Sequence, residues 1–95
     1  LGHIHAYHLT VMSLNSNVDR DNLISDFNES GIQTLVHYRN PAHRYKGYRE
    51  PLKVPRPLKY TEALSPRIIS LPNYSSLEIS MVDFVCGQIK DLASK

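Results

Sequence analysis

Several kinds of residue are scarce in this 95-residue chain, and each scarcity narrows what the protein can be. It has no tryptophan. It has a single cysteine, so no internal disulfide can form. Its four glycines are isolated from one another, which excludes a glycine-rich phosphate loop. The chain contains eleven Lys and Arg residues and nine Asp and Glu residues, so neither sign of charge is in large excess. No apolar run approaches the roughly 18 residues of a membrane span. With 41% hydrophobic residues, we expect one globular domain over 1–95 and no membrane partner.

The cysteine and the first residue bear on where the protein lies and whether it is whole. Cys86 falls in an apolar stripe, which favours a buried thiol in a reducing compartment. No charged start followed by an apolar core marks a signal peptide. We therefore predict a cytoplasmic protein. The chain opens on Leu1 rather than on methionine, which favours a fragment or a processed product.

Apolar periodicity and turn residues predict a strand, a helix and a second strand in the first third of the chain. The dense β-branched and aromatic residues of 6–14 predict a strand. Asp19 can cap a helix that Gly31 ends, so 19–30 is predicted to be helical. The short, β-rich run 32–36 follows at once and predicts another strand.

The second half of the chain is less regular. Prolines preclude a regular helix or a central strand over most of 37–60, which we interpret as a long loop. A helix predicted over 61–69 contains Pro66, so it is either kinked there or restarts with Ser65 as its cap. A connector over 70–74 then leads to a final helix that carries a clear apolar stripe.

The loop 37–60 concentrates positive charge and aromatic rings. It holds seven Lys and Arg against Glu50, with four tyrosines interleaved. Cations among rings suit a nucleotide diphosphate, the acidic surface of a neighbouring domain, or a nucleic acid whose bases stack while its phosphates bind the cations. A solvated basic loop without a ligand explains the composition equally well.

The histidines predict neither a metal site nor a nucleophile. On an extended chain His3 and His5 share a face while His8 points away, and a lone cysteine with scattered carboxylates gives no zinc spacing, so we expect no metal. His37 and His43 flank the start of the loop and could serve as acid, base or hydrogen-bond donor. Neither has an adjacent serine or cysteine in a nucleophile motif.

Three separated motifs resemble the DegT/DnrJ/StrS-type sugar aminotransferases. The stretch 31–48 is similar to the family's GI-x-T-x-x-HYP-x-P-x-H-x-Q-P-x-Y, and 65–74 is similar to S-x-x-I-L-SLP-x-YP. The opening at 6–9 resembles the YHLY strand that begins the family's small C-terminal domain. The spacing between the motifs is kept across nearly the whole chain. The departures are Arg39 for proline, Tyr45 and Lys46 for the Gln-Pro pair, Asn73 for methionine and Ser75 for proline.

This resemblance implies a fold and a division of labour. The fold is α+β, a small antiparallel or mixed sheet with helices on one side, as in the C-terminal domain of fold-type I PLP-dependent transferases. Such enzymes hold pyridoxal phosphate (PLP) as a Schiff base on a lysine and pass an amino group from glutamate to a keto-sugar nucleotide. That lysine belongs to the large domain. The resemblance thus implies no catalytic and no cofactor-binding residue in this chain, which we expect to be inactive alone.

The resemblance also implies partners and a substrate site. The partners are the PLP-binding large domain of the same parent chain, a second copy in a parent homodimer, and a nucleotide sugar for polysaccharide or antibiotic sugar biosynthesis. His37, Tyr38 and His43 match the family's motif and are predicted to line the substrate cleft that this domain closes. Two alternatives remain open. One is a free-standing nucleic-acid-binding module using 37–60, which we favour less, and the other is a remnant that only dimerises.

Overall fold

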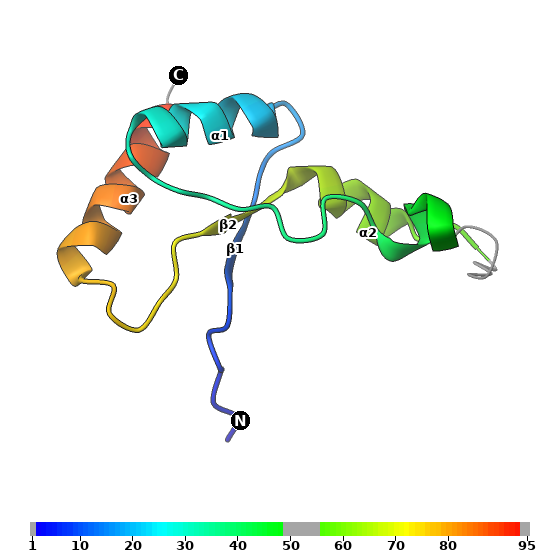
Figure 1. Ribbon diagram of the computed structural model, residues 1–95, viewed down its shortest axis with the longest axis horizontal. Coiled ribbons are helices and arrows are strands. Elements are labelled where there is room, and N and C mark those ends of the chain that lie inside the picture. Colours follow the sequence, from blue (N-terminus) through cyan, green and yellow to red (C-terminus); the bar gives the residue numbers. More distant parts are fainter. Residues whose placement is uncertain (1, 49–55, 94–95) are drawn as a thin grey trace.

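The computed structural model describes residues 2–48 and 56–93. Its elements are β1 (Thr10–Ser13), α1 (Arg20–Glu29), α2 (Lys59–Leu64), β2 (Ile68–Leu71) and α3 (Ile79–Ala93), with 3₁₀ turns at Ala42–Arg44, Lys46–Tyr48 and Ser65–Arg67. The two paired strands lie near the middle of the molecule, α1 and α3 lie together on one side, and α2 extends to the other (Figure 1). No helix of the described residues is long and apolar enough to cross a membrane.

Helix α1 forms where the local sequence predicts it. The Asp19 carboxylate accepts a hydrogen bond from the Asn22 amide at 3.0 Å, which satisfies one of the unpaired amides of the first turn. At the other end Gly31 has a φ of +79°, and the Ile32 amide donates back to the Phe27 carbonyl at 2.8 Å. This is the Schellman arrangement, which turns the chain sharply and places the residue after the glycine over the last helical turn. The predicted helix is confirmed at both ends.

Alanine at Gly31 is expected to lower the free energy of unfolding by about 1 kcal/mol, because an L side chain is strained in the left-handed region. A Cβ at this position would meet nothing within 4 Å, so backbone strain accounts for the whole effect. Urea unfolding measures it. Gly87→Ala is the matched control, since that helical glycine also faces open space and alanine favours helix by up to about 1 kcal/mol. The same loss in both variants would contradict this explanation.

The sheet is antiparallel, which agrees with the antiparallel or mixed sheet that the family resemblance implies. Thr10 of β1 pairs with Leu71 of β2, and the register continues through all four residues of each strand. Leu35 joins the other edge of β2 through two hydrogen bonds with Ser70, of 3.1 and 2.7 Å. The strand predicted over 32–36 is therefore reduced to a single bridge, although alternate side chains of this run are buried and exposed as in a strand.

The core lies between the sheet and the helices α1 and α3, so these two helices pack on the sheet as the predicted α+β fold requires, while α2 lies apart from them. The fully packed side chains are Leu14, Phe27, Ile32, Ile69 and Val85. They come from α1, β2 and α3 and from the connections that follow β1 and α1. Half-buried residues of both strands and of α1 and α3 surround them. A hydrogen bond of 3.2 Å from Ser30 to Gln88 joins α1 to α3 at the edge of this core.

Several predicted boundaries were wrong. The strand predicted over 6–14 is limited to Thr10–Ser13, because β2 offers only four partners. The helix predicted over 61–69 ends at Leu64. Ser65 is the first residue of a 3₁₀ turn and not the N-terminal cap of a second helix. The residues after this turn pair with β1, so Ser70 and Leu71, the first two residues of the predicted connector 70–74, belong to a strand.

The predicted loop 37–60 is irregular over most of the residues that the structure describes. It contains two short 3₁₀ turns, and its last two residues already belong to α2. The part of the prediction that falls on 49–55 lies outside the described residues.

The prediction that Cys86 is buried was wrong, because its side chain is exposed. The apolar arc of α3 is wider than the core that it covers. Val85 and Ile89 face the core, while Cys86 lies with Ile79 and Val82, at steps of three and four residues, on a flank that solvent reaches. The cytoplasmic location consequently loses the support that a buried thiol would have given it.

Candidate substrate-binding groove

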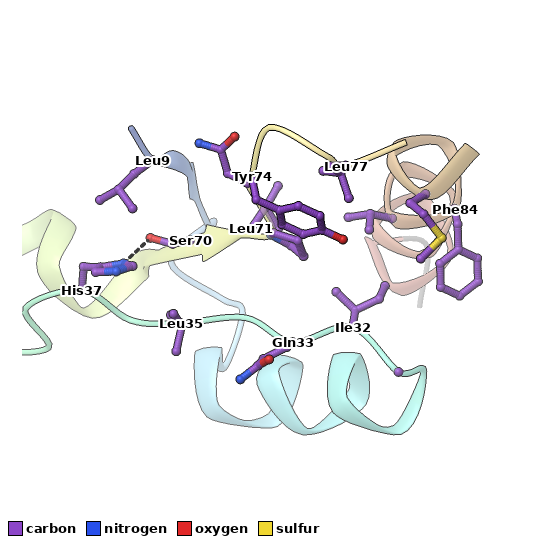
Figure 2. A pocket seen from close by; sticks show the side chains of 15 residues that line it. Leu9, Ile32, Gln33, Leu35, His37, Ser70, Leu71, Tyr74, Leu77 and Phe84 are labelled. Carbon is purple, nitrogen blue, oxygen red and sulfur yellow. Dashed lines mark hydrogen bonds between the residues drawn. The ribbon is translucent and has the colours of Figure 1, made fainter. Parts of the chain in front are cut away.

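A groove of about 420 Å³ lies between α3, the end of β2 and the extended run that follows α1. Its walls are mostly apolar side chains, namely Leu9, Ile32, Leu35, Leu71, Pro72, Tyr74, Leu77, Met81, Phe84 and Val85. Figure 2 shows His37 and Ser70 at one end, and Leu77 and Phe84 at the other beside α3. This volume and this balance of apolar walls with a few polar groups are typical of small-molecule sites.

His37 enters the groove because the chain beside β2 is held in place. The bridge between Leu35 and Ser70 fixes this run against the strand, and alternation along an extended chain brings the side chains of Leu35 and His37 to the same face. The Nδ1 atom of His37 lies 2.8 Å from the hydroxyl of Ser70, which is itself buried. This hydrogen bond orients the imidazole and leaves Nε2 as the ring atom outside it (Figure 2).

Tyr38 lies outside this groove. Its backbone has a φ of +57°, a conformation that non-glycine residues rarely adopt, and its side chain is 82% exposed. The ring lines a separate surface hollow together with Asn40, Ala42 and Tyr45. The structure thus directs this ring into solvent at the cost of some backbone strain, a combination that occurs at binding segments.

His43 is engaged within the chain. Its Nε2 atom lies 2.9 Å from one carboxylate oxygen of Glu62 on α2, and a guanidinium nitrogen of Arg44 lies 3.2 Å from the other. The hydrogen bond from His43, and then the positive charge of Arg44, hold the pKa of Glu62 below its ordinary value. The stabilisation from this carboxylate is complete above the ordinary glutamate pKa and is lost as the pH falls through the lowered pKa.

The three residues predicted to line one cleft thus lie in three different surroundings. His37 lines the groove, Tyr38 lines the surface hollow, and His43 is tied to α2. Their contact with a substrate remains a prediction. Sequence reasoning missed their partners, Ser70 and Glu62. A signal for Glu62 was available, since it is the one acid between Glu50 and Glu78 and follows a strongly basic loop.

The groove does not fit pyridoxal phosphate. Among the described residues, its lining holds no lysine to form a Schiff base and no lysine or arginine to pair with a phosphate. Its polar side-chain groups are one imidazole, the hydroxyls of Ser70 and Tyr74, and the amides of Gln33 and Asn73. Among residues 2–48 and 56–93, no group of three or more His, Cys, Asp or Glu could hold a metal ion. The groove is suited to a neutral polar ligand rather than to the cofactor.

The basic loop is partly neutralised by the chain itself. Arg39 lies 3.0 Å from Asp21 of α1, and Arg44 pairs with Glu62. These two of the loop's seven cations already have a carboxylate partner. The charge that could bind a nucleic acid is correspondingly smaller than the composition suggests.

Comparison with known proteins identifies the family. The sequence profile of the DegT/DnrJ/EryC1/StrS aminotransferase family matches residues 2–90. The crystal structure of a DegT DnrJ EryC1 StrS aminotransferase from Brucella abortus is similar with a TM-score of 0.79 and 26% sequence identity. The match covers 92% of this chain and 22% of that one, so the chain spans about a fifth of that relative's length. The resemblance seen in the three sequence motifs is confirmed, and the chain belongs to the DegT/DnrJ/EryC1/StrS aminotransferase family.

Proposed function

We propose that this chain is the C-terminal small domain of a PLP-dependent aminotransferase that transfers an amino group from glutamate to a keto-sugar nucleotide. A large domain carries the cofactor, and this domain closes the substrate cleft. One observation carries the proposal. The chain matches an aminotransferase family over residues 2–90, yet its groove contains no residue that could hold the cofactor. In the proposed parent, a cytoplasmic homodimer, the cofactor lysine lies outside this chain.

The groove supplies orientation rather than chemistry in this proposal. PLP, when bound by the large domain, supplies the electron sink for amino transfer. His37 and Ser70 form one polar end of the groove, and their mutual hydrogen bond fixes the imidazole before any ligand arrives. A preorganised donor or acceptor of this kind can hold a sugar hydroxyl without ordering a flexible side chain. The apolar walls exclude water once the large domain covers them.

The isolated chain is expected to bind a nucleotide sugar weakly or not at all, because half of the cleft is absent. Isothermal titration of the chain with a uridine diphosphate sugar measures this directly. A dissociation constant below about 1 μM, which corresponds to roughly −8 kcal/mol, would contradict the proposed role.

In the same preparation, incubation with PLP followed by borohydride reduction should give no stoichiometric lysine adduct. A single modified lysine would place the cofactor site in this chain after all.

A further inference from the structure

The turn that carries His43 is held against the rest of the domain by side chains. Its backbone hydrogen bonds are local, from the Arg44 amide to the Pro41 carbonyl at 2.9 Å and from the Tyr45 amide to the Ala42 carbonyl at 3.3 Å. These bonds shape the turn but do not place it. Its position therefore depends on contacts that its side chains make with other elements.

Of the carboxylates in the described part of the chain, Asp21 and Glu62 form ion pairs with this part of the loop, and the two differ in surroundings. Asp21 pairs with Arg39, and both side chains are exposed, at 69% and 52% of their surface. Exposed pairs of this kind contribute little, because water screens them and two long side chains must be ordered. Glu62 contacts a His43 side chain that is only 12% exposed. The Glu62 contact is the stronger candidate for placing the turn.

Helix α2 is tied to the rest of the domain at its C-terminal end, so Glu62 can transmit a position. The Arg67 guanidinium donates to the Ala63 carbonyl at 2.9 Å, and the buried Arg20 donates to the Ser65 carbonyl just beyond the helix. β2 follows a few residues later and pairs along its whole length with β1. A carboxylate mounted on α2 is therefore tied to the sheet and to α1.

The two oxygens of Glu62 are used separately. One faces Nε2 of His43 and the other faces Arg44, so a single carboxylate holds two consecutive residues of the turn. A carboxylate only accepts hydrogen bonds, so the proton of this contact sits on Nε2. In a neutral imidazole the other nitrogen, Nδ1, then has a free lone pair. Glu62 thus determines both the place of the ring and its tautomer.

We propose that Glu62 is the positioning residue of this loop: it seats the Ala42–Arg44 turn on α2 and holds His43 as the Nε2–H tautomer. Nδ1 becomes the acceptor that His43 offers to a donor group of a ligand, such as a sugar hydroxyl. Only this last statement rests on the proposed function. The first two concern the chain's own conformation.

The test uses variants that imitate one ring nitrogen at a time. The amide nitrogen of His43→Gln stands near Nε2, and that of His43→Asn stands near Nδ1. We expect His43→Gln to keep the contact with Glu62, so that the amide hydrogen exchange rates over 42–45 stay within about twofold of those in the unsubstituted chain. His43→Asn and Glu62→Ala should each raise these rates by about fivefold, which corresponds to the roughly 1 kcal/mol of a well-formed ion pair.

The tautomer is read separately, from long-range ¹H–¹⁵N spectra of the histidine side chains at alkaline pH, where imidazoles are neutral. His43 should be the Nε2–H tautomer in the unsubstituted chain and a mixture of the two tautomers in Glu62→Ala. Asp21→Asn is the matched control, because it removes the other carboxylate that reaches this loop, and it should change neither readout.

An Nδ1–H tautomer in the unsubstituted chain would overturn the proposal. So would slower amide hydrogen exchange of the turn in His43→Asn than in His43→Gln. So would equal effects of Asp21→Asn and Glu62→Ala. No sugar nucleotide, cofactor or second domain enters the experiment. Failure of this test therefore leaves the aminotransferase proposal standing, and failure of that proposal would not alter these results.

Discussion

Replacing Phe27 with alanine is expected to lower the free energy of unfolding by about 3–5 kcal/mol. Phe27 has no exposed surface and sits at the centre of the core formed by the sheet, α1 and α3. Its loss removes a large buried surface and leaves a cavity that the surrounding helices cannot fill completely. Because a domain of this size has a free energy of unfolding of only about 5–15 kcal/mol in total, the substitution would remove much of it. Urea unfolding followed by circular dichroism measures the change.

Phe84 provides a control of identical chemistry, since it is the chain's other phenylalanine. Its side chain lies on α3 at the edge of the groove and is 44% exposed. Phe84→Ala should cost no more than about 1–1.5 kcal/mol, because part of the ring is already in water. A Phe27→Ala variant no less stable than Phe84→Ala would mean that the core is not centred where the structure places it.

Replacing Arg20 with methionine is expected to destabilise the fold by about 2–3 kcal/mol. Arg20 opens α1, where a positive charge opposes the helix dipole, and it is only 9% exposed. It occupies this costly place because its guanidinium donates to the Ser65 carbonyl at 2.5 Å and to the Ile68 carbonyl at 3.3 Å. Methionine keeps an unbranched apolar stem but removes the donors, so the loss reports the hydrogen bonds more than the packing.

Two further variants make the Arg20 result interpretable. Arg20→Lys keeps the charge with a single donor point and should lie between the parent and Arg20→Met. Arg39→Met removes an arginine from an exposed ion pair and should change stability by no more than about 0.5 kcal/mol. The Nε atom of Arg20 is buried and has no hydrogen-bond partner. An Arg20→Met variant more stable than the parent would show that the cost of burying this charge outweighs the two carbonyl bonds.

The sequence predicted best where the determinants are local. Both ends of α1 were identified because an aspartate cap and a left-handed glycine act within a few residues of the helix. The family motifs, which extend over most of the chain, implied the α+β fold, an antiparallel or mixed sheet with helices packed on it. His37 was singled out from the same motif; it lines the groove, and its contact with a substrate stays a prediction.

Predictions failed where the outcome depends on distant partners. The residues of β2 follow a run with helical periodicity, and only their pairing with β1, at the other end of the chain, makes them a strand. Cys86 follows the apolar period of α3, but the core is too narrow to cover the whole arc. The partners of His37 and His43, Ser70 and Glu62, lie far along the sequence, and no local pattern joins them.

The order of the strands along the chain has a consequence for biosynthesis. β2 follows β1 only after most of the domain has been made, so the sheet cannot close until both strands have left the ribosome. Until then the edge of β1 is unpaired, and unpaired strand edges are prone to join other chains. We expect α1, whose caps are local, to form during this interval. A chain truncated before Ile68, the first residue of β2, would therefore contain α1 but no sheet.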